Sequence, residues 1–205
     1  MITDRITAPG IEGAQRGVSP GEIFGWSGPL AVAAGASMLL APFLHPEDPR
    51  SAAWVPVHFL YFVTLIAVLL VLVEAFVRQR LQTGRLGSVG FLVAFVGTSM
   101  MLMEGREHLF SHDFGGGTPV GLWQLIATSF VFGLGYVLLG VAVFRAGVLP
   151  RAAGVLLAVG GPIVAFAPPI GIEAVLIVGH ALFGAGLVWL GYALWSGAKG
   201  TPIPR

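Results

Sequence analysis

The chain has 205 residues, of which 56% are hydrophobic and only 10% carry a charge, and its formal net charge is +1. A composition this apolar predicts a membrane protein. The 11 Lys and Arg residues are spread over short segments and form no stripe that could follow phosphates, which argues against a nucleic-acid partner. The chain has no cysteine, so disulfides, thiolate metal sites and a cysteine nucleophile are excluded.

Apolar stretches of about 20 residues, the length that crosses a bilayer as a helix, recur along the chain. Six are expected to span the membrane: residues 24–44, 53–76, 87–110, 120–144, 149–167 and 173–195. The predicted fold is therefore all-α, a polytopic bundle of six transmembrane helices within residues 23–196, surrounded by the lipid bilayer. Residues 1–22 and 197–205 are expected to be cytoplasmic tails.

The distribution of charge predicts the orientation of these helices. Nine of the 11 Lys and Arg residues lie in the two tails, in the expected loop 78–85 or in the expected loop 145–151, which the positive-inside rule places in the cytoplasm. An even number of spans puts both termini on that side. The opposite side is acidic, and all five histidines lie at or near it: His45, His58, His108, His112 and His180.

Glycine spacing predicts which helix faces are buried, because small residues let helix backbones approach each other in a membrane. Gly90, Gly97 and Glu104 follow one another at intervals of seven residues, so Glu104 is expected to face the interior of the bundle. His180 precedes Gly184 by four residues, which predicts the same orientation for this histidine.

Several of these polar groups are expected at a similar depth. At a rise of about 1.5 Å per residue, His58 and His180 lie roughly 8 and 10 Å below their helix ends, and Glu104 lies at a similar level. His108 follows Glu104 by one turn, so this pair could chelate from a single helix. We expect these four residues to converge on one extracytoplasmic pocket, which requires the second, third and sixth spans to be mutual neighbours. The outer candidates are His45, Glu107 and His112.

Three functions are compatible with this arrangement. Imidazole and carboxylate groups are ligands of zinc, iron and copper, so the first is a transition-metal site that supports hydrolysis or redox chemistry. The second is a b-type haem held by two of His58, His108 and His180, as in an electron-transfer subunit. In the third, the chain is a non-catalytic subunit or scaffold of a larger membrane complex, or a homo-oligomer, and the histidines only meet water and headgroups.

Other polar residues of the apolar segments suggest structural or supporting roles. Glu74 and Arg78 are one turn apart near the cytoplasmic end of the second span, which predicts an interfacial ion pair. Gln124 and Thr128 are also one turn apart, in the outer half of the fourth span. We expect both to provide hydrogen bonds around the candidate site.

The segment 145–157 (RAGVLPRAAGVLL), together with Gly179-His180 and the segment 190–195 (LGYALW), resembles a broad set of uncharacterised bacterial multi-pass membrane proteins. The likeness covers mainly the last three spans. It implies a bacterial inner-membrane location and carries no activity with it.

Overall fold

The computed structural model describes residues 25–46, 48, 50–114 and 121–198, except for the side chains of residues 107–114, 168, 169 and 198. This part of the chain forms five helices and no strand, so the predicted all-α class is confirmed. The helices are α2 (Ser27–Leu44), α3 (Trp54–Phe114), α4 (Leu122–Ala146), α5 (Arg151–Ile170) and α6 (Glu173–Ala198). Most of the two predicted tails, residues 1–24 and 199–205, lies outside the described residues.

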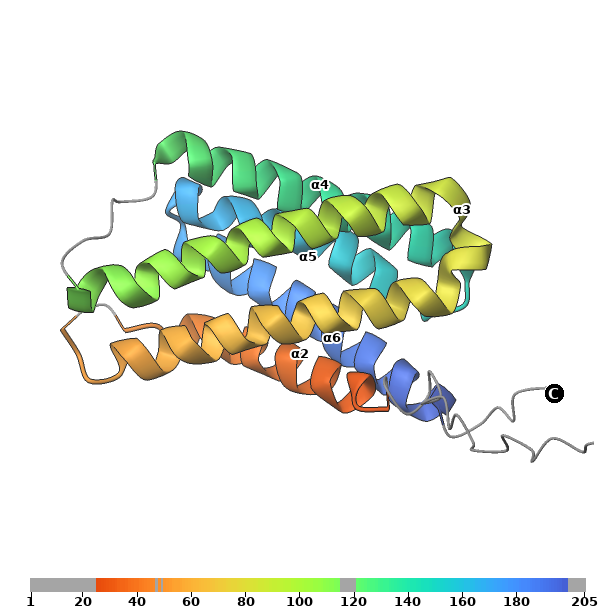
Figure 1. The fold of residues 1–205 in the computed structure, drawn as a ribbon, viewed down its shortest axis with the longest axis horizontal. Helices are drawn as coiled ribbons and strands as arrows, with labels where there is room; N and C mark the ends of the chain where they lie inside the picture. The colour runs from red at the N-terminus through yellow and green to blue at the C-terminus, as the bar shows by residue number, and fades with distance from the viewer. Residues whose placement is uncertain (1–24, 47, 49, 115–120, 199–205) are drawn as a thin grey trace, which may run out of the picture.

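Helix α3 consists of two arms that meet at Gly84. This glycine has φ 57° and ψ −145°, a conformation that residues with a Cβ rarely adopt. The two arms run side by side from the bend (Figure 1). A loop was expected over residues 78–85, and that expectation is wrong, because the helix continues up to Gly84 on one side and resumes directly after it. The intervening Gln, Arg and Leu residues are good helix formers, so a single glycine is enough to reverse the chain.

Most helices are long enough to cross a bilayer. Four segments qualify by length and composition: Ser27–Leu44, Trp54–Arg106, Leu122–Ala146 and Glu173–Gly197. The apolar part of α5, Arg151–Ala167, is shorter. Helix α5 itself extends past the predicted end at residue 167 and stops before Gly171, which adopts φ 71° as its C-cap. These long apolar helices indicate a membrane protein.

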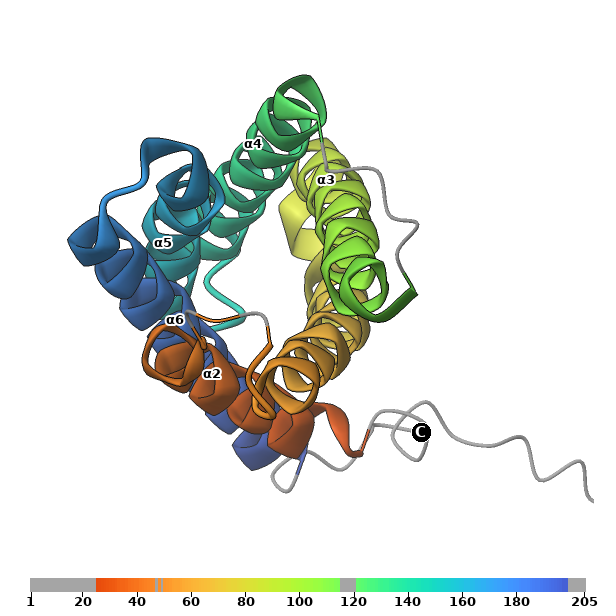
Figure 2. The ribbon, with the colours of Figure 1, turned by 90° about the vertical axis from the view of Figure 1, so that its left-hand side faces the viewer.

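The helices form a ring, which is seen along its axis in Figure 2. Helix α3 packs against α2 and α4, whereas α6 packs mainly against α2 and α5. The two arms of α3 and helix α6 were expected to be mutual neighbours, and this is wrong, because α6 lies across the interior from α3 (Figure 2). Short links make successive helices pack against each other, and contact between α2 and α6 then closes the ring.

Glycines set the close contacts between neighbouring helices. A Cβ at Gly97 of α3 would lie 2.5 Å from Phe132 Cα of α4, so the two backbones touch. Helices α2 and α6 meet in the same way, because a Cβ at Gly35 would lie 2.6 Å from the carbonyl oxygen of Gly184. Such approach is the usual basis of helix association in membranes, where no hydrophobic effect drives helices together.

Aromatic side chains fill the middle of the bundle. Phe132 and Tyr136 of α4 and Phe183 of α6 are fully buried, and their rings pack with centroids 4.5 to 5.7 Å apart. The Tyr136 hydroxyl shares a 3.1 Å hydrogen bond with Thr98 of α3, so its polar atom is satisfied. This cluster separates the two ends of the interior.

We predict that Gly97→Ala destabilises the protein by about 1 to 3 kcal/mol, because the added methyl group must push the α4 backbone away. Gly105→Ala is the matched control on the same helix, since its Cβ would meet nothing closer than Tyr61 Cδ1 at 3.9 Å. Thermal unfolding in detergent measures both. Equal unfolding temperatures for the two variants would contradict the close contact.

Candidate functional site

A cavity of about 890 Å³ lies at the end of the bundle where α2 and α5 end and α6 begins. All five helices contribute to its wall. We call it the histidine cavity, because its lining includes His45, His58 and His180 together with Tyr61, Glu104 and Glu173. The rest of the wall is mostly aliphatic. A large apolar cavity with a few convergent polar groups is the usual form of a small-ligand site.

The residues expected to lie deepest do reach this cavity from three directions. His58 comes from the first arm of α3, Glu104 from the second arm and His180 from α6, and each is 5 to 7% exposed. The inward orientation predicted for Glu104 and His180 is therefore confirmed. His45, an outer candidate, is exposed and follows the last residue of α2 at the same cavity.

Both buried histidines are held by the same backbone contact. Nδ1 of His58 lies 2.9 Å from the carbonyl oxygen of Trp54, and Nδ1 of His180 lies 2.9 Å from that of Leu176. A carbonyl oxygen can only accept, so Nδ1 carries the proton in each ring. In the neutral imidazole, Nε2 then holds the lone pair. This is the arrangement that orients histidines that bind metals.

Aromatic contacts further restrain the first of these histidines. The Trp54 ring stacks on His58 with centroids 4.1 Å apart, and the His45 ring meets His58 edge-on at 5.2 Å. His45 and Trp54 lie on either side of the link between α2 and α3, and their rings pack with each other and with the His58 ring. The position of His58 therefore depends on both ends of the link.

Sequence reasoning missed three polar residues of the wall. Tyr61 follows His58 by three residues, and this helical spacing was a signal that could have found it. Ser37 of α2 accepts a 2.8 Å hydrogen bond from Thr64, and Ser129 of α4 donates one of 2.7 Å to the carbonyl oxygen of Ala165. No spacing in the sequence distinguishes these two serines from the others.

The hydrogen-bonding role expected for Gln124 and Thr128 is not found. Gln124 is exposed, and Thr128 is buried without a hydrogen-bond partner among the described residues. The residues of α4 that reach the cavity are Leu125 and Ser129, each one position further along the chain. One residue turns a helix by about 100°, so the cavity wall is formed by the positions next to the predicted ones.

The remaining candidates, Glu107, His108 and His112, lie in the second arm of α3, but their side chains are outside the described part of the structure. Among the side chains that are described, no three His, Asp or Glu residues are close enough together to hold one metal ion. The described wall also contains no Lys or Arg. Its ionisable groups are therefore carboxylates, imidazoles and a phenol, a set that suits a cationic ligand.

No family model matches the chain, and no curated protein or solved structure shows significant similarity to it. The case for a function therefore depends on the residues of the cavity.

We predict that nitrogen NMR of histidine-labelled protein finds His58 and His180 as the tautomer protonated at Nδ1. The carbonyl partners at 2.9 Å leave no other neutral form that satisfies both groups. Assignment by His58→Gln and His180→Gln identifies the two signals. Protonation at Nε2 with Nδ1 bare would contradict the hydrogen bonds described above.

Proposed function

We propose that the chain is a bacterial inner-membrane protein that binds a transition metal ion in the histidine cavity, with the cavity open to the extracytoplasmic side. One observation carries this proposal: two imidazoles with their Nδ1 atoms bonded to the backbone and the carboxylate of Glu104 line a single cavity. Neutral imidazole and carboxylate are the ligands that zinc, iron and copper accept.

Binding by these residues requires the cavity to close. Ligand atoms must come within about 2.0 to 2.2 Å of the ion, which is closer than the described side chains lie. His108 is one turn from Glu104 and is the fourth ligand that we propose. His58, Glu104 and His180 are buried in an apolar wall, which favours closure around a cation. The bound cation would neutralise the Glu104 carboxylate at membrane depth.

The proposed orientation follows from the two ends of the bundle. Arg78, Arg80 and Arg85 lie around the α3 bend, and Arg145 and Arg151 lie at the link between α4 and α5, all at the end opposite the histidine cavity. The positive-inside rule makes that end cytoplasmic. Trp54 and Trp123 would then lie at the outer interface.

Six membrane crossings are part of the same proposal. The apolar segment Trp54–Arg106 is more than twice the length that one crossing needs, and it reverses at Gly84, so it supplies two. Helix α5, with 20 residues, would also cross once. With an even number of crossings, both termini would lie in the cytoplasm.

We predict that green fluorescent protein fused after Lys199 fluoresces and that alkaline phosphatase fused there is inactive. The reason is that the basic end of the bundle should remain in the cytoplasm. Alkaline phosphatase and green fluorescent protein fusions at the same position make the measurement. A fusion after Asp48, close to the cavity, is the control for the other side. Phosphatase activity at the C-terminus would reverse the proposed orientation.

We predict that the purified protein binds Zn²⁺ or Co²⁺ stoichiometrically in equilibrium dialysis. His58→Ala, His180→Ala and Glu104→Gln should each weaken binding by more than about 100-fold, since even partners of the ligands contribute up to that factor. Thr128→Val is the control, because Thr128 is an equally buried polar residue that does not line the cavity. Unchanged affinity in the three cavity variants would contradict the proposed site.

A b-type haem is the second candidate, and the size of the cavity favours it. Two histidines with Nδ1 bonded to the backbone lie on helices that face each other across an apolar space of about 890 Å³. Haem iron needs only two axial ligands, such as His58 and His180. The absorption spectrum of the purified protein separates the candidates, because only haem gives a Soret band. If the purified protein binds neither metal nor haem, the scaffold interpretation remains.

A further inference from the structure

The end of the bundle opposite the histidine cavity holds an ion pair with a buried carboxylate, which the proposed metal site does not use. Glu74 and Arg78 of α3 form a salt bridge, and their side chains are 4% and 29% exposed. Burying a carboxylate costs free energy, and buried ionisable groups in membrane helices commonly mark a path for ions or substrates. The ion pair expected from the spacing is confirmed, and its carboxylate is buried against the protein.

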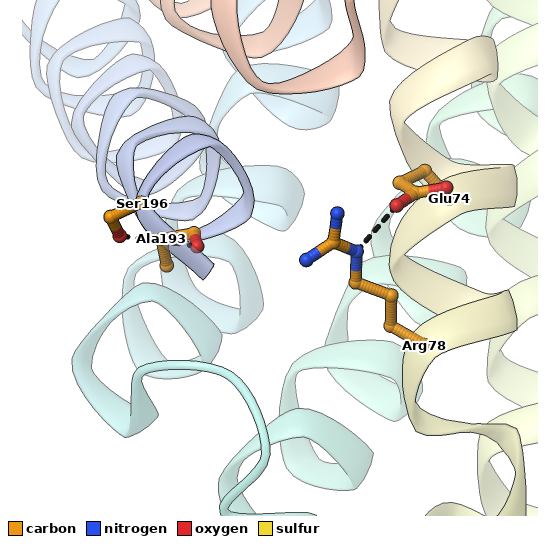
Figure 3. A network of polar contacts seen from close by, with 4 residues as sticks. All are labelled: Glu74, Arg78, Ala193 and Ser196. Atoms are coloured by element: carbon orange, nitrogen blue, oxygen red, sulfur yellow. Dashed lines mark hydrogen bonds and ion pairs between the residues drawn. The ribbon is translucent and has the colours of Figure 1, made fainter. Parts of the chain in front are cut away.

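Arg78 also reaches across the ring to α6. A Cβ at Gly197 would lie 3.4 Å from Nη1 of Arg78, so the guanidinium lies against the last turn of α6. Figure 3 shows it directed from Glu74 toward the turn that contains Ala193 and Ser196. The last carbonyl groups of a helix have no partner in the helix and carry partial negative charge. Helix α6 has no basic residue of its own in that turn, so Arg78 supplies the cation.

This contact joins two helices that otherwise face each other across the interior. Helix α6 packs mainly against α2 and α5, not against α3. We call the Glu74 carboxylate, the Arg78 guanidinium and the last turn of α6 the α3–α6 bridge. It therefore links two sides of the ring at the end opposite the histidine cavity.

A buried amide follows Arg78 in the sequence. Gln79 is 0% exposed, and neither its Oε1 nor its Nε2 has a hydrogen-bond partner among the described residues. An amide buried in this way costs several kcal/mol in an apolar environment unless something binds it. Its position suits a group that bonds to a passing ion, or to the water around it, when the bridge is open.

The two facing helices have the same order of residues along the interior. In the first arm of α3, cavity residues are followed by buried apolar side chains and then by the bridge, and the apolar set is Leu65, Val68, Leu72 and Ala75. In α6 the corresponding set is Phe183, Leu187, Leu190 and Leu194. From His58 to Arg78 the helix rises about 30 Å, the thickness of a bilayer core.

We propose that the bundle transports the cation of the histidine cavity across the membrane and that the α3–α6 bridge is the cytoplasmic gate of this path. The cavity is the outer half of the path, the apolar middle separates it from the gate, and opening the bridge gives access from the cytoplasmic side. This transport rests on the proposed metal site, whereas the gate itself can be tested without any ligand.

The absence of native cysteine allows a direct test of the gate in inside-out and right-side-out vesicles. Ser37→Cys reports on the cavity, and Ala75→Cys reports on the interior next to the bridge. A membrane-impermeant methanethiosulfonate should label Ser37→Cys from the outer side and leave Ala75→Cys unlabelled. Adding Arg78→Ala or Glu74→Gln should raise labelling of Ala75→Cys from the cytoplasmic side about tenfold or more, because losing one partner of a buried pair shifts the population toward the open state.

Arg80→Ala is the matched control, since Arg80 is exposed on the same helix and should leave labelling unchanged. Ser37→Cys is also combined with each gate variant, and its labelling from the outer side shows that the bundle is folded. Unchanged labelling of Ala75→Cys in either folded variant would overturn the gate. Two gate variants are used because one could fail to fold.

Transport is tested with the same proteins in liposomes that contain a fluorescent zinc indicator. Arg78→Ala should raise Zn²⁺ uptake about tenfold over the wild type, in line with the expected shift toward the open state, and adding Glu104→Gln should abolish it. Increased labelling without any change in uptake would overturn transport and make the bridge a purely structural contact. The wild type could bind no Zn²⁺ in dialysis while labelling of Ala75→Cys still rises in the gate variants. In that case the metal site is wrong and the gate stands.

Discussion

Close approach of helix backbones at glycine is the contact on which the whole bundle depends. Every pair of neighbours in the ring except α2 and α3 meets in this way, and in each pair a glycine Cβ would lie 2.3 to 2.6 Å from an atom of the next helix. The pairs are α3 with α4, α4 with α5, α5 with α6, and α2 with α6. The residues that face these glycines include Phe132 and Phe183, whose side chains are buried in the bundle. They fill the middle of the ring, and the histidine cavity remains at the end where they stop.

The sequence carried enough information to orient the buried polar residues, because the glycine spacing is a property of one helix. Glu104 continues the spacing of Gly90 and Gly97 and lines the cavity, as predicted. His180, four residues before Gly184, also lines the cavity. What the spacing could not give was the order of helices around the ring. The contact between α2 and α6 joins the first and last helices, and no local pattern shows which distant helices will meet.

Two errors have a local physical cause. The segment 78–85 was expected to be a loop because it is polar, but its residues favour helix, and only the conformation of Gly84 interrupts it. In α4 the polar Gln124 suggested an inward face, whereas the wall is formed by Leu125 and Ser129. Polarity is a poor guide to phase near a helix end, where an exposed side chain can reach water or headgroups.

The bend at Gly84 has a consequence for the way in which the protein is assembled. Its two arms are joined by a single non-helical residue, so no soluble loop separates them and neither arm can extend across a bilayer without drawing in the other. We expect them to insert together as a helical hairpin, with the arginines around the bend left on the side where synthesis takes place. The orientation of the later helices would then follow from one early event.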